Sequence, residues 1–169
     1  MKKLYYITGV SGTGKTTLAE ELNKLGYYTL DQDTISSWKH NETKEDAKFE
    51  HGIGKEFLEA NDWYADIDKL KDILEEAPEV AFVCGVSANQ DEYLNIFDKV
   101  FLLQCSLDTF VKRIDTRVNN DFGKHPLEKE HILNWYEGYE KHLIEQGALV
   151  INSDAPIEDV IDEILKKIN

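Results

Sequence analysis

The chain has 169 residues and lacks any apolar run near the roughly 20 residues that a membrane-spanning helix needs. It contains only two cysteines, Cys84 and Cys105, which have no metal-ligand spacing and stand at the ends of strand-like runs. Met1-Lys2-Lys3 leads directly into the first predicted strand, so no signal peptide is expected. These absences predict a cytoplasmic protein with reduced core thiols and no membrane partner.

Positive charge is scarce, and arginine most of all. The net charge is −14, from 19 lysines and arginines against 33 aspartates and glutamates, and Arg113 and Arg117 are the only arginines. Such a surface repels nucleic acids and anionic membranes, so neither is expected as a partner. It also repels nucleotides, so a phosphate site requires a local concentration of positive groups.

Residues 9–16 form a complete phosphate-binding loop of the pattern G-x-x-x-x-G-K-[ST]. Its glycines let backbone N–H groups turn toward a phosphate chain, while Lys15 reaches the phosphates and the Thr16 hydroxyl is suited to ligate Mg²⁺. A strand-like segment precedes the loop, and leucines at helical spacing follow it. The sequence therefore predicts ATP and Mg²⁺ as cofactors. The predicted nucleotide-binding residues are Gly9, Ser11, Gly12, Thr13, Gly14, Lys15, Thr16 and Thr17.

Apolar strands alternate with helical segments along the chain. Continuous apolar strands are typical of a parallel sheet with helices on both faces, and ligands bind at the carboxyl ends of its strands. We therefore expect a single α/β domain over residues 1–169. The predicted strands are 4–7, 27–30, 80–84, 99–103 and 149–151, and helices are predicted after the phosphate loop, within 34–79, from Ser106, over 127–145 and from Pro156.

Residues 34–79 are charged and helical in pattern. Gly52 and Gly54 interrupt this pattern, and Asn61-Asp62 is expected to form a turn and cap before a helix that runs to Ala77. The sequence thus predicts a helical insertion between the second and third strands of the sheet.

Asp31 and Asp33 follow the second predicted strand. Alternate residues leaving a strand point the same way, so both carboxylates are placed to face the phosphates. Phosphoryl transfer to a hydroxyl needs one carboxylate to receive the proton and another to hold the Mg²⁺ shell. The alternative is that Asp33 only caps a helix that begins at Thr34.

The phosphate loop, the Asp-x-Asp pair, the insertion and the arginine-bearing helix before a polar flap occur in one order. This order resembles the small P-loop kinases, which include shikimate kinase, gluconate kinase and the adenylate-kinase-type nucleoside and nucleotide kinases. The resemblance spans the whole chain and implies a three-layer P-loop NTPase fold. It implies a five-stranded parallel sheet of order 2-3-1-4-5, inserted acceptor-binding helices over 34–79, and a mobile lid over 117–126.

The resemblance also implies a division of work between the two carboxylates. Asp31 would lie on the Mg²⁺ side with Thr16, and Asp33 would serve as the catalytic group at the acceptor hydroxyl. Cys84-Gly85 stands where many relatives of this fold carry an acidic residue, which makes Asp31 the favoured metal partner.

Arg113 and Arg117 are four residues apart and therefore share a helix face. They resemble the lid arginines that stabilise charge on the transferred phosphoryl group, so both are predicted catalytic residues together with Lys15. The alternative is a solvated pair with Asp115 and Asp121 as neighbours.

The acceptor side of the predicted site has an unusual composition. Residues 34–79 hold six lysines, thirteen carboxylates and no arginine. Kinases normally bind the phosphate or carboxylate of an acceptor through bidentate hydrogen bonds from arginine. The absence of arginine here therefore argues against a nucleoside monophosphate and against shikimate as the acceptor. Aromatic faces can stack on a base or sugar and amides can read its polar edges, although core packing is the alternative for the aromatics. The predicted acceptor-binding residues are Asp33, Trp38, Trp63, Asn89 and Gln90.

The predicted function is phosphoryl transfer from Mg-ATP to a hydroxyl of a small, neutral metabolite, with a nucleoside favoured over a sugar. One alternative is a nucleotide kinase, which would grip the acceptor phosphate with Lys39, Lys44 or the lid arginines. The other is an ATP-binding regulatory NTPase without an acceptor. Asp33 disfavours the regulatory NTPase, because such a protein needs a group that positions water for hydrolysis and not a base for an acceptor hydroxyl.

Overall fold

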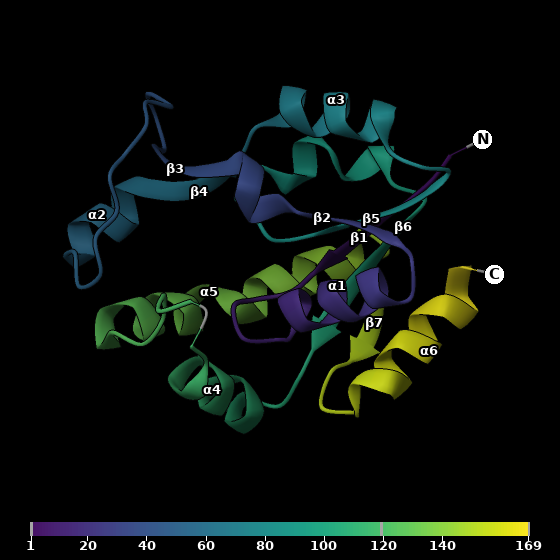
Figure 1. Cartoon of the computed structure of the whole chain (residues 1–169). Coiled ribbons are helices and arrows are strands. Elements are labelled where there is room, and N and C mark those ends of the chain that lie inside the picture. The colour runs from purple at the N-terminus through teal and green to yellow at the C-terminus, as the bar shows by residue number, and fades with distance from the viewer. Residues whose placement is uncertain (1, 119, 169) are drawn as a thin grey trace.

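A five-stranded parallel sheet forms the centre of the protein (Figure 1). The computed structural model describes residues 2–118 and 120–168. The strands lie in the order β2-β5-β1-β6-β7. Counted within this sheet alone, that is the predicted order 2-3-1-4-5, so both the fold class and the sheet order are confirmed. The strands are β1 (Lys3–Thr8), β2 (Tyr28–Asp31), β5 (Val80–Cys84), β6 (Lys99–Gln104) and β7 (Leu149–Asn152).

Helices cover both faces of this sheet, because its strands are apolar on both sides. Tyr5 and Ile7 on β1 belong to a buried cluster with α1 (Lys15–Lys24) and α6 (Ile157–Ile168). Tyr6 points to the opposite face, where it packs with residues of α3 (Ile67–Glu76). The long helix α5 (Pro126–Glu145) lies on this second face, where Tyr139 meets Thr8 of β1 through a 2.5 Å hydrogen bond. The result is the three-layer arrangement that continuous apolar strands require.

A third buried cluster packs the phosphate loop against two helices. It contains Val10 of the loop, Phe110 and Ile114 of α4 (Leu107–Thr116), and Ile132 of α5. The Ser106 side chain caps α4 by accepting a hydrogen bond from Thr109 N, as the sequence predicts. The loop that follows β1 is therefore held against two helices.

The insertion differs from its predicted helical form. Residues 36–40 and 61–65 form an antiparallel hairpin, and Asn61 and Asp62 lie within its second strand instead of in a turn and cap. Asp66 caps α3 instead, with its side chain accepting from Lys69 N at 3.1 Å. Aromatic residues directly opposite each other in the hairpin account for the strand form, because cross-strand aromatic pairs outweigh local helix propensity. The elements here are η1 (Gln32–Ile35), β3 (Ser36–His40), α2 (Lys55–Ala60), β4 (Asn61–Ala65) and α3.

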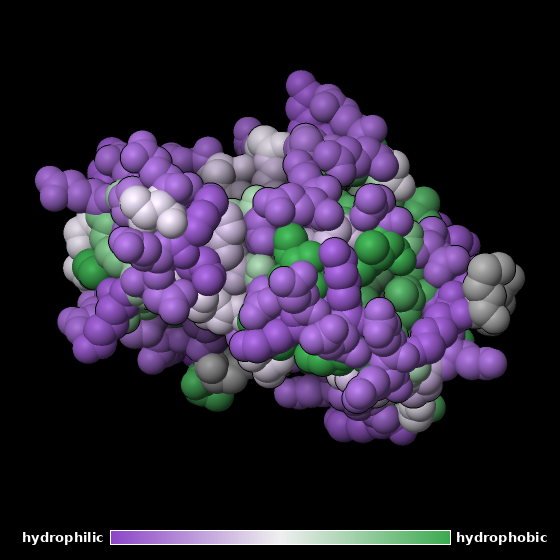
Figure 2. All heavy atoms as spheres, turned by 90° about the horizontal axis from the view of Figure 1, so that it is seen from above, coloured by the Kyte–Doolittle hydropathy of each residue, from purple (hydrophilic) through white to green (hydrophobic). Residues whose placement is uncertain are grey.

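The hairpin and α2 extend away from the central sheet (Figure 1). Seen from above, the molecule presents mostly hydrophilic side chains, with hydrophobic ones gathered in separate patches between them (Figure 2). Within residues 2–118 and 120–168, no helix combines the length and the apolar character needed to cross a bilayer.

Candidate active site

The loop between β1 and α1 has the backbone conformation of a phosphate cradle. Gly12 and Gly14 have φ angles of +93° and +100°, a region that side-chain-bearing residues rarely adopt. A Cβ on Gly12 would also lie 3.0 Å from Ile114 Cγ1 beneath the loop. Gly14 occupies the N-cap of α1, so the free N–H groups of that helix begin inside the loop.

Lys15 is held inside the loop without a carboxylate partner. Its Nζ donates to Gly9 O at 2.6 Å and to Val10 O at 2.9 Å. Desolvation lowers the pKa of Lys15 to about 8, the Asp33 charge opposes this shift, and Arg117 adds to it. Among the described residues, no salt bridge compensates this ammonium group. An anion bound in the loop would supply the missing charge.

A cavity of about 440 Å³ opens beside the loop at the carboxyl ends of the strands. Asp33 and Val86 border it where β2 and β5 end. Four residues from the segment after β7 and from α6 also line it, and no sequence pattern predicted them: Ser153, Ala155, Ile157 and Val160. The rule that ligands sit at the carboxyl edge of a parallel sheet was the signal that could have found them. Of the predicted site residues, the cavity brings together Ser11, Gly12, Thr13, Gly14, Lys15, Thr16, Thr17, Asp33, Arg113 and Arg117.

Both arginines are partly buried at the wall of this cavity, and neither is a solvated surface residue. Arg113 donates to Thr13 O at 3.3 Å and to Ser153 O at 2.8 Å, so it bridges the phosphate loop and the segment after β7. Arg117 donates to Phe122 O, and its buried Nε has no hydrogen-bond partner among the described residues. Desolvation lowers the pKa of Arg117, partly opposed by Asp121 and Asp33. A buried guanidinium nitrogen without a partner favours an anion nearby.

The two carboxylates have different environments. Asp31 caps the short η1 turn by accepting from Asp33 N at 3.0 Å, which overturns the alternative that Asp33 is the cap. Desolvation raises the pKa of Asp31, and the charge of Asp33 contributes to the rise. Asp33 is exposed toward the cavity, and its Oδ1 accepts from the Trp63 indole N–H at 3.1 Å.

Oxygen ligands for a divalent cation are few. Within the part of the chain that the structure describes, no cluster of three or more His, Cys, Asp or Glu residues could cage a metal ion. The Thr16 hydroxyl and the Asp31 carboxylate are hard oxygen donors of the kind that Mg²⁺ prefers. This donor set fits an ion that takes most of its ligands from phosphates and water.

Of the predicted acceptor residues, only Asp33 borders the cavity, and the others lie outside its lining: Trp38, Trp63, Asn89 and Gln90. Trp38 stacks on Phe49 with ring centroids 5.0 Å apart, and Phe122 packs against both rings. Trp38 thus belongs to an aromatic cluster between the hairpin and the flap. This placement matches the packing alternative for Trp38, which the burial tendencies of tryptophan favour.

The structure also places Asn89 and Gln90 in contacts within the protein. The Asn89 amide bonds to both Ala65 N and Ala65 O at 3.0 Å. Gln90 is only 3% exposed and accepts from Tyr139 OH at 3.0 Å. Packing and sheet support therefore occupy these amides, in place of the acceptor contacts that the sequence predicts.

A buried carboxylate links the flap to the insertion. Glu128 is fully buried, and its oxygens accept from Gly123 N at 2.8 Å and Gly52 N at 3.1 Å. His51 Nδ1 lies 3.2 Å away from the same side chain. The predicted lid, 117–126, is therefore docked on the insertion here, while its residue Asn119 lies outside the described residues. Sequence reasoning missed Glu128, because a glutamate in the first turn of a helix ordinarily interacts only with that helix.

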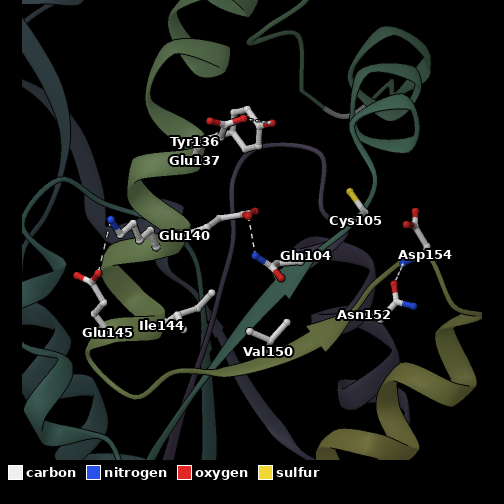
Figure 3. A pocket seen from close by; sticks show the side chains of 11 residues that line it. Gln104, Cys105, Tyr136, Glu137, Glu140, Ile144, Glu145, Val150, Asn152 and Asp154 are labelled. Carbon is white, nitrogen blue, oxygen red and sulfur yellow. Dashed lines mark hydrogen bonds and ion pairs between the residues drawn. The ribbon is translucent and has the colours of Figure 1, made fainter.

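A wider groove of about 780 Å³ lies between α5 and the edge of the sheet (Figure 3). Glu140 points across it and accepts from Gln104 Nε2 at 2.6 Å, and Lys141 pairs with Glu145 at 3.9 Å. Because carboxylates dominate its charged lining, this groove repels phosphate groups. The smaller cavity beside the loop is therefore the candidate phosphate site.

The sheet order, the three layers and the phosphate loop define the class of the protein as an α/β P-loop NTPase with the fold of the small P-loop kinases. The chain belongs to the AAA domain family, which matches residues 6–135. A comparison with curated proteins finds no match.

Solved structures with the same fold align over nearly the whole chain. The deoxyadenosine kinase from M. mycoides with bound dATP is 19% identical, with a TM-score of 0.56, over 98% of this chain and 99% of that one. A shikimate kinase from Bacteroides thetaiotaomicron is 19% identical, with a TM-score of 0.60, over 98% of both chains. A sugar kinase from Janibacter sp. HTCC2649 is 15% identical, with a TM-score of 0.60, over 98% of this chain and 94% of that one. At these identities the likeness concerns the fold.

Proposed function

We propose that the protein is a small-molecule kinase that transfers the terminal phosphoryl group of Mg-ATP to a hydroxyl of a small, neutral metabolite. One observation carries this proposal: a single cavity is bordered by the phosphate loop, Lys15, both arginines and the carboxylate of Asp33. A carboxylate beside a cationic phosphate site is the arrangement that transfer to a hydroxyl needs. Proteins of the same fold include a deoxyadenosine kinase and a sugar kinase, which supports a nucleoside or sugar-like acceptor.

The phosphate chain of ATP would lie in the loop, with Lys15 and the N–H groups of α1 on its oxygens. The base would then occupy the part of the cavity between Thr116 on α4 and Ala155 and Ile157 after β7. Thr16 and Asp31 would hold Mg²⁺, which neutralises charge between the phosphates when it is bound.

The chemical step needs one proton acceptor and several positive groups. Asp33 takes the proton of the acceptor hydroxyl, and that oxygen forms a bond to the terminal phosphorus. The bond from this phosphorus to the bridging oxygen breaks, and its electron pair leaves with ADP. Lys15, Arg113 and Arg117 stabilise the negative charge that shifts onto the phosphate oxygens.

The lysines of the insertion favour a neutral acceptor over a nucleoside monophosphate. Lys39 Nζ lies 3.4 Å from a carboxylate oxygen of Asp46. Lys44 donates to Tyr64 OH at 2.7 Å and lies 4.1 Å from the centre of the same ring. Contacts within the insertion thus engage the two lysines that a nucleotide kinase would direct at an acceptor phosphate.

We further propose that residues 34–79 bind the acceptor and that the flap, 117–126, acts as the lid of a single domain.

Cys84 and Cys105 are free thiols, which suits the reducing cytoplasm.

A coupled ADP-release screen tests the proposed function. The purified protein is assayed with Mg-ATP and nucleosides, nucleoside monophosphates, sugars, shikimate and aminoglycosides, with Lys15→Ala as the inactive control. We expect ADP release that depends on a neutral, hydroxyl-bearing acceptor. A low rate that no metabolite changes would favour the regulatory NTPase, and a response only to monophosphates would favour the nucleotide kinase.

A further inference from the structure

Asp33 carries a hydrogen bond that its role at the acceptor does not itself require. Trp63 donates its indole N–H to Asp33 Oδ1 at 3.1 Å, although the two residues belong to different elements. No partner for the second oxygen, Oδ2, is found among the described residues. The carboxylate thus has one oxygen held by the hairpin and one available to the cavity that it borders.

We propose that Trp63 is a positioning residue for Asp33, and not a stacking platform for the acceptor. This inference rests on the proposed function, in which Asp33 receives the acceptor proton. An exposed aspartate rotates among several side-chain conformations. The indole N–H selects the conformation in which Oδ1 faces the hairpin, which directs Oδ2 toward the cavity. Fixing a proton acceptor matters because a displacement of about 1 Å can cost about 100-fold in rate.

The backbone around Trp63 is anchored to the central sheet. Ala88 N donates to Trp63 O at 2.8 Å. The Asn89 amide clamps Ala65, two residues further along β4, through two hydrogen bonds of 3.0 Å. Ala88 and Asn89 follow β5, and Asp33 follows β2, which pairs directly with β5. The donor and the acceptor of the indole hydrogen bond are therefore both fixed to neighbouring strands, as precise positioning demands.

The hairpin also supplies a matched control. Trp38 lies directly opposite Trp63 in the register of β3 and β4, with ring centroids 6.0 Å apart. Its indole N–H has no hydrogen-bond partner among the described residues. Phenylalanine in place of either tryptophan keeps an aromatic ring, but only Trp63→Phe removes a hydrogen bond to Asp33.

The first test observes the hydrogen bond itself and needs no activity. The ¹H–¹⁵N spectrum of the three tryptophan indoles is assigned with the Trp38→Phe and Trp63→Phe variants. In Asp33→Ala we expect the Trp63 indole proton to move upfield and to exchange faster with solvent, while the Trp135 signal stays in place. A Trp63 signal unaffected by this change would overturn the proposal.

The second test measures turnover with an acceptor from the ADP-release screen. We expect Trp63→Phe to lower kcat by about 10- to 100-fold, the range for a hydrogen bond to a charged group, with the acceptor KM nearly unchanged. Trp38→Phe should lower kcat much less than Trp63→Phe, because it removes no hydrogen bond to Asp33. A raised acceptor KM with intact kcat in Trp63→Phe would mean stacking and overturn the proposal, as would equal losses of kcat in both variants. If the unaltered protein phosphorylates no acceptor, the proposed function fails, and the indole spectrum still decides whether Trp63 holds Asp33.

Discussion

Replacing Glu128 by glutamine tests how the flap is held against the insertion. The carboxylate is fully buried at the start of α5, where it accepts from Gly123 N at 2.8 Å and from Gly52 N at 3.1 Å. Glu128→Gln keeps the shape of the side chain but exchanges one acceptor oxygen for an NH₂ donor. The new NH₂ donor must then face one of these two backbone N–H groups, each of which donates to a carboxylate oxygen of Glu128 in the unaltered protein.

The cost depends on which way the new amide turns. If its NH₂ faces Gly123, a buried N–H loses its acceptor, which costs about 1–3 kcal/mol. If it faces Gly52, which is exposed, water satisfies that N–H, and the loss falls to about 1 kcal/mol. The second orientation is favoured, so the expected loss is about 1–2 kcal/mol. For a domain of this size, that corresponds to a Tm lower by about 2–8 °C.

Urea unfolding and thermal scans measure this loss, and amide hydrogen exchange of Gly123 shows where it acts. We expect the Gly52 amide to exchange faster in Glu128→Gln, because it loses its acceptor in the favoured orientation. The Gly123 amide should also exchange faster, because its remaining acceptor is a neutral oxygen in place of a carboxylate oxygen. Glu130→Gln is the control, since Glu130 is exposed on the same helix and makes no hydrogen bond among the described residues. If both variants are equally stable and protect Gly123 equally, the carboxylate does not hold the flap.

The remaining predictions concern the phosphate site and the chemical step. Lys15→Ala should abolish ATP binding by calorimetry while its circular dichroism stays native, and full activity in this variant would refute the site. Because the pKa of Lys15 is lowered from 10.5 to about 8, the ATP affinity of the unaltered protein should fall as the pH rises through 8, and an affinity that stays constant across this range would contradict the prediction. Between pH 8 and 10.5, Lys15 is protonated in the unfolded state but largely neutral in the folded state. Because the unfolded state binds more protons in this range, the contribution of Lys15 makes the free energy of unfolding increase with pH. Asp33→Asn should cut turnover by roughly 10²–10⁴-fold with ATP affinity little changed, whereas an equal loss of affinity would indicate a metal ligand. Replacing Arg113 and Arg117 together by methionine should reduce kcat far more than ATP affinity, because their contacts strengthen as charge develops; equal losses in steady-state kinetics and binding would contradict this.

The central strands of the sheet could be predicted because they are largely apolar on both faces. Residues 80–84 and 100–103 are continuous apolar runs, and β5 and β6 begin and end within one residue of them. The phosphate loop fixes β1 before it and α1 after it, because the motif has one structural context. Local pattern and tertiary structure agree at these positions, which is why sequence reasoning succeeds there.

The hairpin could not be predicted, because its strands are specified by partners distant in sequence. Ser36–His40 and Asn61–Ala65 are short, charged in part and only partly buried, so they lack the apolar alternation of an ordinary strand. The Trp38 and Trp63 rings meet only when the two segments pair in the observed register. The contact between Trp63 and Asp33 could not be predicted for the same reason, because the two residues are distant in sequence and no spacing pattern relates them.

The two arginines show most clearly what tertiary structure adds to a motif. Spacing alone makes Arg113 and Arg117 equivalent, since it predicts both on one face of one helix. The structure corrects this, because α4 ends at Thr116 and Arg117 is its C-cap residue in an extended conformation. In the structure Arg113 spans Thr13 O and Ser153 O, so its hydrogen bonds belong to the fixed wall of the cavity. Arg117 instead donates to the flap at Phe122 O, and its Nε has no hydrogen-bond partner among the described residues. Desolvation lowers the pKa of Arg117. A guanidinium group stays charged in proteins, so burial of Arg117 carries a cost that an anion in the cavity offsets. In a chain with a net charge of −14, we expect this pairing of a fixed and an unsatisfied arginine to make the cavity prefer phosphate over other ligands.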